Sequence, residues 1–158
     1  MPKLERLALP EEYGRTTETL PWATVSEWLT TAKQYWVAIN RPGSSPHVVP
    51  VDGIWTEDTL WYGGGQATAH VRLAEADPNV TVHLPDPWKV VVVHGEARKA
   101  KPTRELSQHL ADLANAKYTE YGITYDANSF ADPFALHPHR VIAWSSFPRD
   151  ATRYVFED

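Results

Sequence analysis

Residues 46–78 read PHVVPVDGIWTEDTLWYGGGQATAHVRLAEADP, and this stretch decides the fold. Its β-branched and aromatic residues, interrupted by a short polar turn, predict a strand, a hairpin and a second strand. Three glycines, Gly63 to Gly65, then lead into a short helix for which Thr68 is the expected N-cap. The rest of the sequence is interpreted around this order of elements.

The short helix begins with positive charge. His70 and Arg72 follow directly after Thr68. A helix N-terminus presents unpaired N–H groups and about half a positive charge, so it normally attracts Asp or Glu. Basic residues at this position make sense if an anion lies between them and the helix, and phosphate is the usual one. The sequence therefore predicts an anion site at this turn.

Length and composition limit the classes of protein to consider. A chain of 158 residues is large enough for one domain with a single core. It has no Cys, which excludes disulfides and Cys-based zinc sites. No leader-like or membrane-spanning apolar run is present, so we expect a cytoplasmic protein without membrane association. Its net charge of −5 argues against nucleic-acid binding.

Periodicity outside the opening stretch predicts further short strands and two more helices. Thr24 and Glu27 fit a capping box for a first helix, and Thr103 is the expected N-cap of a long one, Thr103–Lys117. The short helix covers Thr68–Ala76, and residues 1–20 are expected to be irregular. The predicted strands are Tyr35–Asn40, His47–Trp55, Thr59–Tyr62, Val80–Leu84, Lys89–Ala97, Val141–Ser145 and Arg153–Phe156. They indicate a mainly β (α+β) barrel or sandwich, an antiparallel meander with helices packed at its ends.

Two prolines punctuate the strand that begins at His47. Pro46 precedes it and Pro50 lies within it. Proline donates no ladder hydrogen bond, so it belongs at a sheet edge or a bulge. Such a strand leaves backbone groups free to bind a ligand, or the prolines simply protect an edge from aggregation.

Several segments, in order, resemble a known family. They are YWVAI with its Pro-Gly turn, PHVVPVDGIW, TLWYGGG with T-x-H-x-R, ADPNVTVHL, VVVVHGEA and AWSSFPRDATRYVF. Together they resemble the FMN-binding split barrels related to pyridoxamine 5′-phosphate oxidase. The most similar branch is the flavin/deazaflavin oxidoreductases, which use FMN or the deazaflavin coenzyme F420. The Arg-x-x-x-Leu-Lys pattern of true pyridoxamine phosphate oxidases is absent, so the resemblance does not imply a vitamin B6 substrate.

The resemblance implies a split β-barrel of about seven antiparallel strands, forming a single domain over residues 1–158. It implies a homodimer with cofactor sites at the subunit interface. The strand beside the flavin-type ring would comprise His47, Val48, Val49, Pro50 and Val51. The phosphate would be held by Gly64, Gly65, Thr68, His70 and Arg72.

Several other residues allow either a functional or a purely structural interpretation. Trp55, Trp88 and Trp144 are candidate walls of a substrate pocket, although Trp serves mostly in packing. The aromatic segment from Tyr118 to Phe134 either covers the ring or closes the barrel as core. The basic stretch from Arg98 to Arg104 either is a solvated surface or meets the acidic tail of the deazaflavin. The His137-Pro-His139 pair lacks further ligands at a recognisable spacing, so no metal site is predicted.

These observations favour an oxidoreductase in which bound F420 or FMN exchanges hydride with a small organic substrate. No catalytic side chain is identified. The alternative is a non-catalytic carrier of the same fold, which would bind flavin, deazaflavin or haem.

Overall fold

The structure is a computed structural model and describes residues 1–157. Its strands are β1 (Lys3–Arg6), β2 (Tyr35–Ile39), β3 (His47–Val51), β4 (Gly53–Thr56), β5 (Thr59–Tyr62), β6 (Asn79–His83), β7 (Val90–Lys99), β8 (Phe134–Trp144) and β9 (Thr152–Val155). Its α-helices are α1 (Trp22–Thr31), α2 (Ala69–Ala76) and α3 (Arg104–Lys117). Short 3-10 turns are η1 (Glu11–Tyr13), η2 (Thr119–Tyr121) and η3 (Ala127–Phe130).

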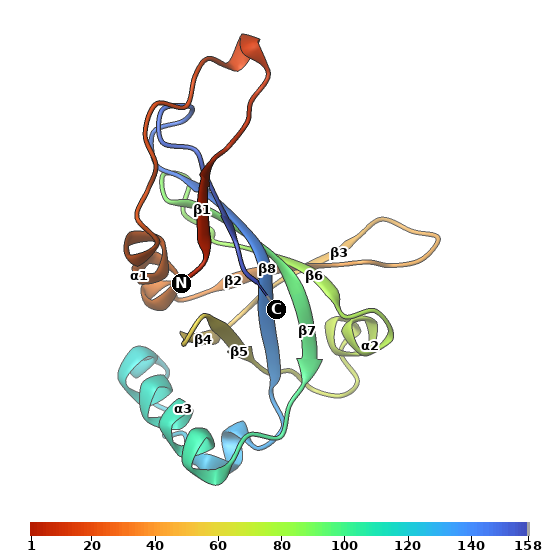
Figure 1. Cartoon of the computed structure of the whole chain (residues 1–158). Helices are drawn as coiled ribbons and strands as arrows, with labels where there is room; N and C mark the ends of the chain where they lie inside the picture. The colour runs from red at the N-terminus through yellow and green to blue at the C-terminus, as the bar shows by residue number, and fades with distance from the viewer. Residues whose placement is uncertain (158) are drawn as a thin grey trace.

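The strands form a barrel (Figure 1). At one point two neighbouring strands are joined by the continuous backbone and not by hydrogen bonds between them. All the pairings are antiparallel, in the order β1-β9-β8-β7-β6-β2-β3, and β5 pairs with both β4 and β8. Strands β3 and β4 do not pair with each other, although only Asp52 separates them in sequence. Seven strands therefore make a ring that is split between β3 and β4, while β1 and β9 extend one side of it. The predicted split barrel is confirmed.

On the edge that does not face β7, strand β8 pairs with two different strands. Its first residues pair with β5 and its last ones pair with β9, so Pro138 falls between the two contacts. The ladder with β7 shifts register at this level, between His94 and Gly95. A proline is tolerated at such an irregularity because no regular ladder donor is required there.

The core fills the inside of the barrel with alternate residues of each strand. Tyr35, Val37 and Ile39 of β2 are buried, and so are Val91 and Val93 of β7. Helix α1 covers one end of this core with Trp22, Val25 and Leu29. Helix α3 packs against β4 through a smaller cluster that contains Ile54, Leu110, Ala114 and Tyr118.

Several predicted boundaries were wrong. Helix α1 begins at Trp22 with Pro21 as N-cap, so Thr24 lies inside the helix and forms no capping box. Residues 1–20 are not wholly irregular, because β1 pairs with β9. The predicted strand His47–Trp55 is two strands, and the predicted strand Val141–Ser145 is the end of the longer β8. Local sequence missed β1 and the start of β8 because their pairing partners are distant in the chain.

Other local predictions were confirmed. Thr103 caps α3, since its Oγ1 accepts a hydrogen bond of 3.2 Å from the Leu106 N–H. Glu57 and Asp58 both have positive φ, 49° and 54°, as a tight two-residue hairpin between β4 and β5 requires.

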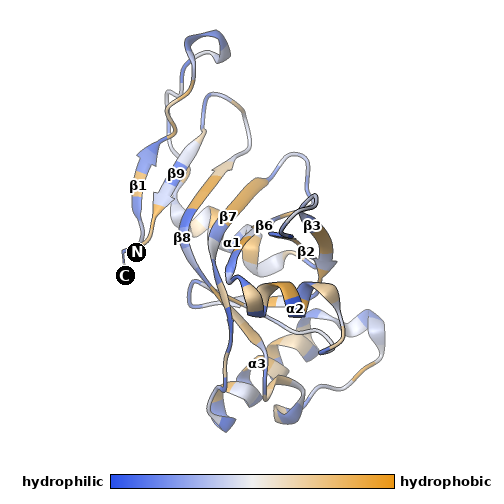
Figure 2. Cartoon of the chain, turned by 90° about the vertical axis from the view of Figure 1, so that its right-hand side faces the viewer, coloured by the Kyte–Doolittle hydropathy of each residue, from blue (hydrophilic) through white to orange (hydrophobic). Residues whose placement is uncertain are grey.

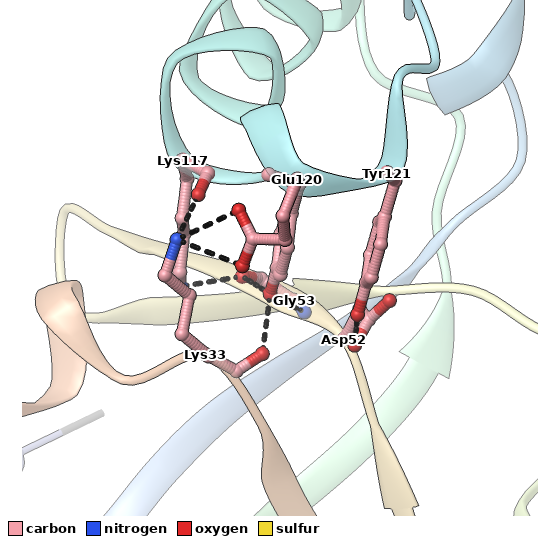
Figure 3. Close-up of polar contacts among 7 residues, drawn as sticks. Lys33, Asp52, Gly53, Lys117, Glu120 and Tyr121 are labelled. Atoms are coloured by element: carbon pink, nitrogen blue, oxygen red, sulfur yellow. Dashed lines mark hydrogen bonds and ion pairs between the residues drawn. The ribbon is translucent and has the colours of Figure 1, made fainter.

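The split is held together at Gly53. The Gly53 N–H donates to the Tyr118 hydroxyl at 2.8 Å, and the Gly53 carbonyl accepts from Lys117 Nζ at 2.8 Å (Figure 3). The Tyr118 hydroxyl in turn donates toward the carbonyls of Lys33, at 2.8 Å, and of Gly53, at 3.0 Å. The C-terminal end of α3 is thus anchored to the point where β3 turns into β4.

Prediction for Gly53. A Cβ added there would lie 2.9 Å from Leu60 Cδ1 and 3.0 Å from the Trp61 carbonyl oxygen. We expect Gly53→Ala to lower the free energy of unfolding by about 1–3 kcal/mol, the usual cost of overpacking. Denaturant unfolding measures this change. Gly63→Ala is the matched control, because nothing lies within 4 Å of its added Cβ; equal stability losses in both variants would contradict the steric argument.

Candidate functional site

The start of α2 has the open N–H groups expected of an anion site. Thr68 occupies the N-cap position, but no side chain caps the helix. Its hydroxyl donates instead to the Gly65 carbonyl at 2.7 Å, which tightens the turn. The first turn contains no acidic residue. The N-terminal amides of this eight-residue helix are therefore available to a negatively charged group.

Arg72 is the cation that this turn leaves exposed. It lies one turn into α2, and within residues 1–157 its guanidinium forms no ion pair. A guanidinium binds phosphate through two parallel N–H donors. Arg72 therefore remains available as the charged partner of an anion at α2.

His70 is placed differently from the charge partner that the resemblance implied. Its side chain is half-buried and faces Tyr62, with ring centroids 6.4 Å apart. Burial lowers the pKa of His70 below 6.5, and the charges of His47 and Lys99 lower it further. This environment favours the uncharged imidazole, and its Nδ1 is buried without a hydrogen-bond partner within residues 1–157.

Gly64 is explained by this histidine. A Cβ on Gly64 would lie 2.5 Å from the His70 Nε2 and Cε1 atoms and 2.9 Å from Val71 Cγ2. No side chain fits where the loop backbone crosses the imidazole. The glycine thus permits a close approach of the loop to His70, a role that the sequence pattern alone did not reveal.

The predicted ring-binding strand, His47–Val51, presents two different faces. His47 is near enough to His70 to affect its pKa, and its Nδ1 accepts a 2.6 Å hydrogen bond from Arg41. Val49 packs against the core and Val51 is buried, whereas Val48 and Pro50 are exposed. A flat ring can therefore contact only part of this set directly. Strand β3 pairs only with β2 within residues 1–157, so its second edge is open.

A cavity of about 350 Å³ lies beside the split in the barrel. It is bounded by the bend between β3 and β4, the end of β5 up to Gly63, helix α3 and the segment 125–130. Trp61, Tyr118, Tyr125 and Phe130 line it. Because Gly63 begins the glycine run, the cavity adjoins the turn that leads to α2. Of the loop that leads to α2, only Gly63 lines the cavity.

The aromatic segment is divided between the cavity and the core. Tyr125 and Phe130 line the cavity, whereas Phe134 is fully buried in β8 and stacks on Tyr62 at 5.4 Å. Sequence patterns could not divide the segment, because the division depends on where η2 and η3 return the chain to the barrel.

The three predicted pocket tryptophans do not form one wall. Trp55 is 3% exposed and packs in the core, with its ring 6.3 Å from that of Trp22. Trp88 is 77% exposed in the turn between β6 and β7, and Trp144 packs against Phe147. The tryptophan at the cavity is Trp61, which the sequence reasoning missed. Its only signal was its position just before the glycine run.

The remaining candidates are surface groups. In the basic stretch, Arg98 pairs with Glu96 and Lys99 pairs with Asp132. Lys101 and Arg104 are exposed. Within residues 1–157, no three His, Asp or Glu side chains gather as metal ligands would. No helix in that range combines the length and the apolar character needed to cross a membrane.

Comparison with known proteins identifies the fold. No family model matches the chain, and no curated protein matches it. Among solved structures, an FAD-binding protein from Mesorhizobium loti is similar, with a TM-score of 0.61 and 19% identity over 89% of this chain and 97% of that one. A NimC/NimA family protein from Clostridium acetobutylicum has a TM-score of 0.60 and 15% identity over 85% and 91%.

A candidate pyridoxamine 5′-phosphate oxidase from Listeria innocua is also similar, with a TM-score of 0.59 and 14% identity over 79% of this chain and 96% of that one. These structures confirm the expected fold, that of flavin-binding split barrels. At such low identity they show the fold alone.

Prediction for His70. We expect NMR titration of its ring protons to give a pKa below 6.5 in the ligand-free protein. The pKa of His70 is lower in the folded protein than in the unfolded chain, so the unfolded chain is protonated first as the pH falls. His70 therefore lowers the free energy of unfolding as the pH falls below 6.5. Binding of FMN with its phosphate at α2 should raise this pKa. A pKa that FMN leaves unchanged at saturation would argue against phosphate at this turn.

Proposed function

We propose that this protein is an oxidoreductase that binds F420 or FMN and transfers hydride between that cofactor and a small organic substrate. The observation that carries the proposal is the uncapped, cationic start of α2, in a chain that also has an aromatic-lined cavity at the split with Gly63 in its wall. A phosphorylated flavin-type cofactor requires such a pair of sites, one for its anion and one next to its ring.

The residues present fit the phosphate end of such a cofactor. The open amides of α2 and the unpaired guanidinium of Arg72 would hold the phosphate. Gly65 supplies the turn that Thr68 tightens. His70 would act as a neutral hydrogen-bonding neighbour, since burial disfavours its charged form. His47, at the open strand edge, would lie between the phosphate and the ring.

The cavity supplies the other requirement, a dry space beside the ring. A bound flavin or deazaflavin supplies the hydride chemistry itself. The chain then has to orient the two reactants and exclude water. Tyr118 is not free to act as an acid, because its hydroxyl is bonded to Gly53 and Lys33 and burial raises its pKa. The proposal therefore assigns no catalytic proton donor.

We propose further that the protein is a homodimer formed through the outer face of the barrel. Cross-strand neighbours on this face are Pro50, Trp36, His83, Val92 and Ile142, on five successive strands. These side chains are half-exposed or exposed, and the parts of β7 and β8 that carry two of them are hydrophobic in Figure 2. Four of the five side chains in this row are apolar, and an exposed apolar row of this kind is typical of an interface. It begins at β3, so a partner there would adjoin the proposed cofactor site.

Prediction for the dimer. We expect sedimentation velocity to give the mass of two chains for the wild-type protein. Ile142→Asp places a charge at the β8 end of this row and should shift the protein to one chain. Glu27→Gln, on the exposed side of α1, is the control and should leave the mass unchanged. A wild-type protein that sediments as a single chain at all concentrations would refute the dimer.

Prediction for cofactor binding. We expect the purified protein to bind F420, FMN or both in absorbance and fluorescence titrations, with FAD as a third ligand to compare. Arg72→Ala should weaken binding by about 1.5–3 kcal/mol, the loss expected for a charged hydrogen bond. Arg15→Ala, an exposed arginine of the N-terminal segment, is the control.

Turnover then separates an enzyme from a carrier. With an enzyme, an unsaturated or quinone-like acceptor accelerates oxidation of the pre-reduced cofactor, whereas a carrier gives no acceleration. A protein that binds none of the three cofactors would refute the proposed function.

A further inference from the structure

We propose that the cavity beside Gly53 selects a flat aromatic molecule that carries a positive charge, with Asp52 as the group that recognises the charge. The inference rests on the proposed function in taking this cavity as the substrate site. It concerns the cavity's own residues, however, and is testable without a cofactor.

The walls of the cavity favour a flat, apolar body. Tyr125 and Phe130 pack together on one side, with ring centroids 6.2 Å apart. Tyr118 lies opposite the strands and stacks on Tyr121 at 5.4 Å, with the two rings nearly parallel. Trp61 contributes a third aromatic surface. A volume of about 350 Å³ accommodates a molecule of two or three fused rings.

Among residues 1–157, Asp52 is the only charged residue that lines this cavity. It is exposed at the bend between β3 and β4, and its Oδ1 accepts a 3.2 Å hydrogen bond from the Tyr121 hydroxyl. Within residues 1–157, Asp52 forms no ion pair with Lys, Arg or His. A carboxylate set among aromatic rings attracts an organic cation through both its charge and the negative ring faces.

The nearby lysines do not neutralise Asp52 directly. In Figure 3, Lys117 and Asp52 lie on opposite sides of Gly53. Lys117 donates to the Gly53 carbonyl and to the Tyr35 hydroxyl, both at 2.8 Å, and it lines a different cavity, between α1 and α3. Lys33 is paired with Glu120 at 3.3 Å.

The neighbouring rings already accommodate cations. The ammonium groups of Lys33 and Lys117 lie 5.7 and 5.4 Å from the centre of the Tyr118 ring. The Tyr118 ring thus already lies near two cations of the protein. On the side of the cavity the carboxylate of Asp52 has no such partner, and an incoming cation would supply it.

The test compares two probes of nearly the same shape, N-methylquinolinium and neutral quinoline, in the cofactor-free protein. Binding is followed by the NMR shift of the Trp61 indole N–H, assigned with Trp61→Phe. We expect the wild-type protein to bind the cation about fivefold more tightly than quinoline, as a partly solvated cation–π and carboxylate contact allows. In Asp52→Asn this preference should fall to about one, with the affinity for quinoline unchanged.

Two control variants keep the test specific. Asp112→Asn removes an exposed carboxylate of α3 outside the cavity and should keep the preference. Tyr121→Phe removes the hydrogen bond to Asp52 but retains its charge, and should also keep the preference. Equal affinities for the two probes in the wild-type protein, a preference that survives in Asp52→Asn, or no shift at Trp61 with either probe would overturn the inference.

The outcome is distinguishable from that of the proposed function. If F420 or FMN binds and turns over but the probes show no charge preference, only the substrate class is refuted. If no cofactor binds but the preference holds and depends on Asp52, the cavity remains a cation site and the oxidoreductase proposal fails.

Discussion

The structure depends on how the backbone of Gly53 is held. Strands β3 and β4 belong to different hairpins, so the barrel is closed at this point by covalent continuity rather than by a ladder of hydrogen bonds. Tyr118 bonds to both the N–H and the carbonyl of Gly53, and Lys117 adds a second donor to the carbonyl. Helix α3 thereby substitutes for the missing ladder, and the space it spans becomes the cavity.

The contacts that hold Gly53 include a charged group, the ammonium of Lys117, which forms no ion pair within residues 1–157. Burial lowers the pKa of Lys117 to about 8, helped by the charge of Lys33 and opposed by that of Asp52. Its ammonium donates to the neutral oxygens of Tyr35 and Gly53 and lies over the rings of Tyr35 and Tyr118, and the charge of Asp52 also favours it. A buried charge contributes little net stability, but it is costly to leave unsatisfied. The hydrogen bonds of Tyr118 and Lys117 to Gly53 therefore fix the position of the end of α3, and with it the shape of the cavity.

The turn before α2 meets two requirements, the close packing of the loop on His70 and the conformation of the helix start. Gly64 is needed because the loop backbone crosses the His70 ring, and Thr68 uses its hydroxyl to tighten the turn instead of capping the helix. The result is an uncapped helix start with Arg72 unpaired beside it. The hydroxyl that tightens the loop therefore does not cap the helix, and no side chain caps α2.

Sequence alone determined the elements whose signals are local. The alternation in β2 and β7, the Glu57–Asp58 hairpin and the Thr103 cap depend on neighbouring residues, and they were predicted within a residue or two. The charges that predict an anion site at α2 are also local in the chain, and that site stays a prediction. Tertiary structure decided the rest. The break at Asp52, the length of β8, the pairing of β1, the inward turn of His70 and the choice of Trp61 over Trp55, Trp88 and Trp144 all depend on contacts between distant segments. Such contacts produce no periodic pattern in the sequence. Each depends on which strand edge or helix end the fold brings next to the residue.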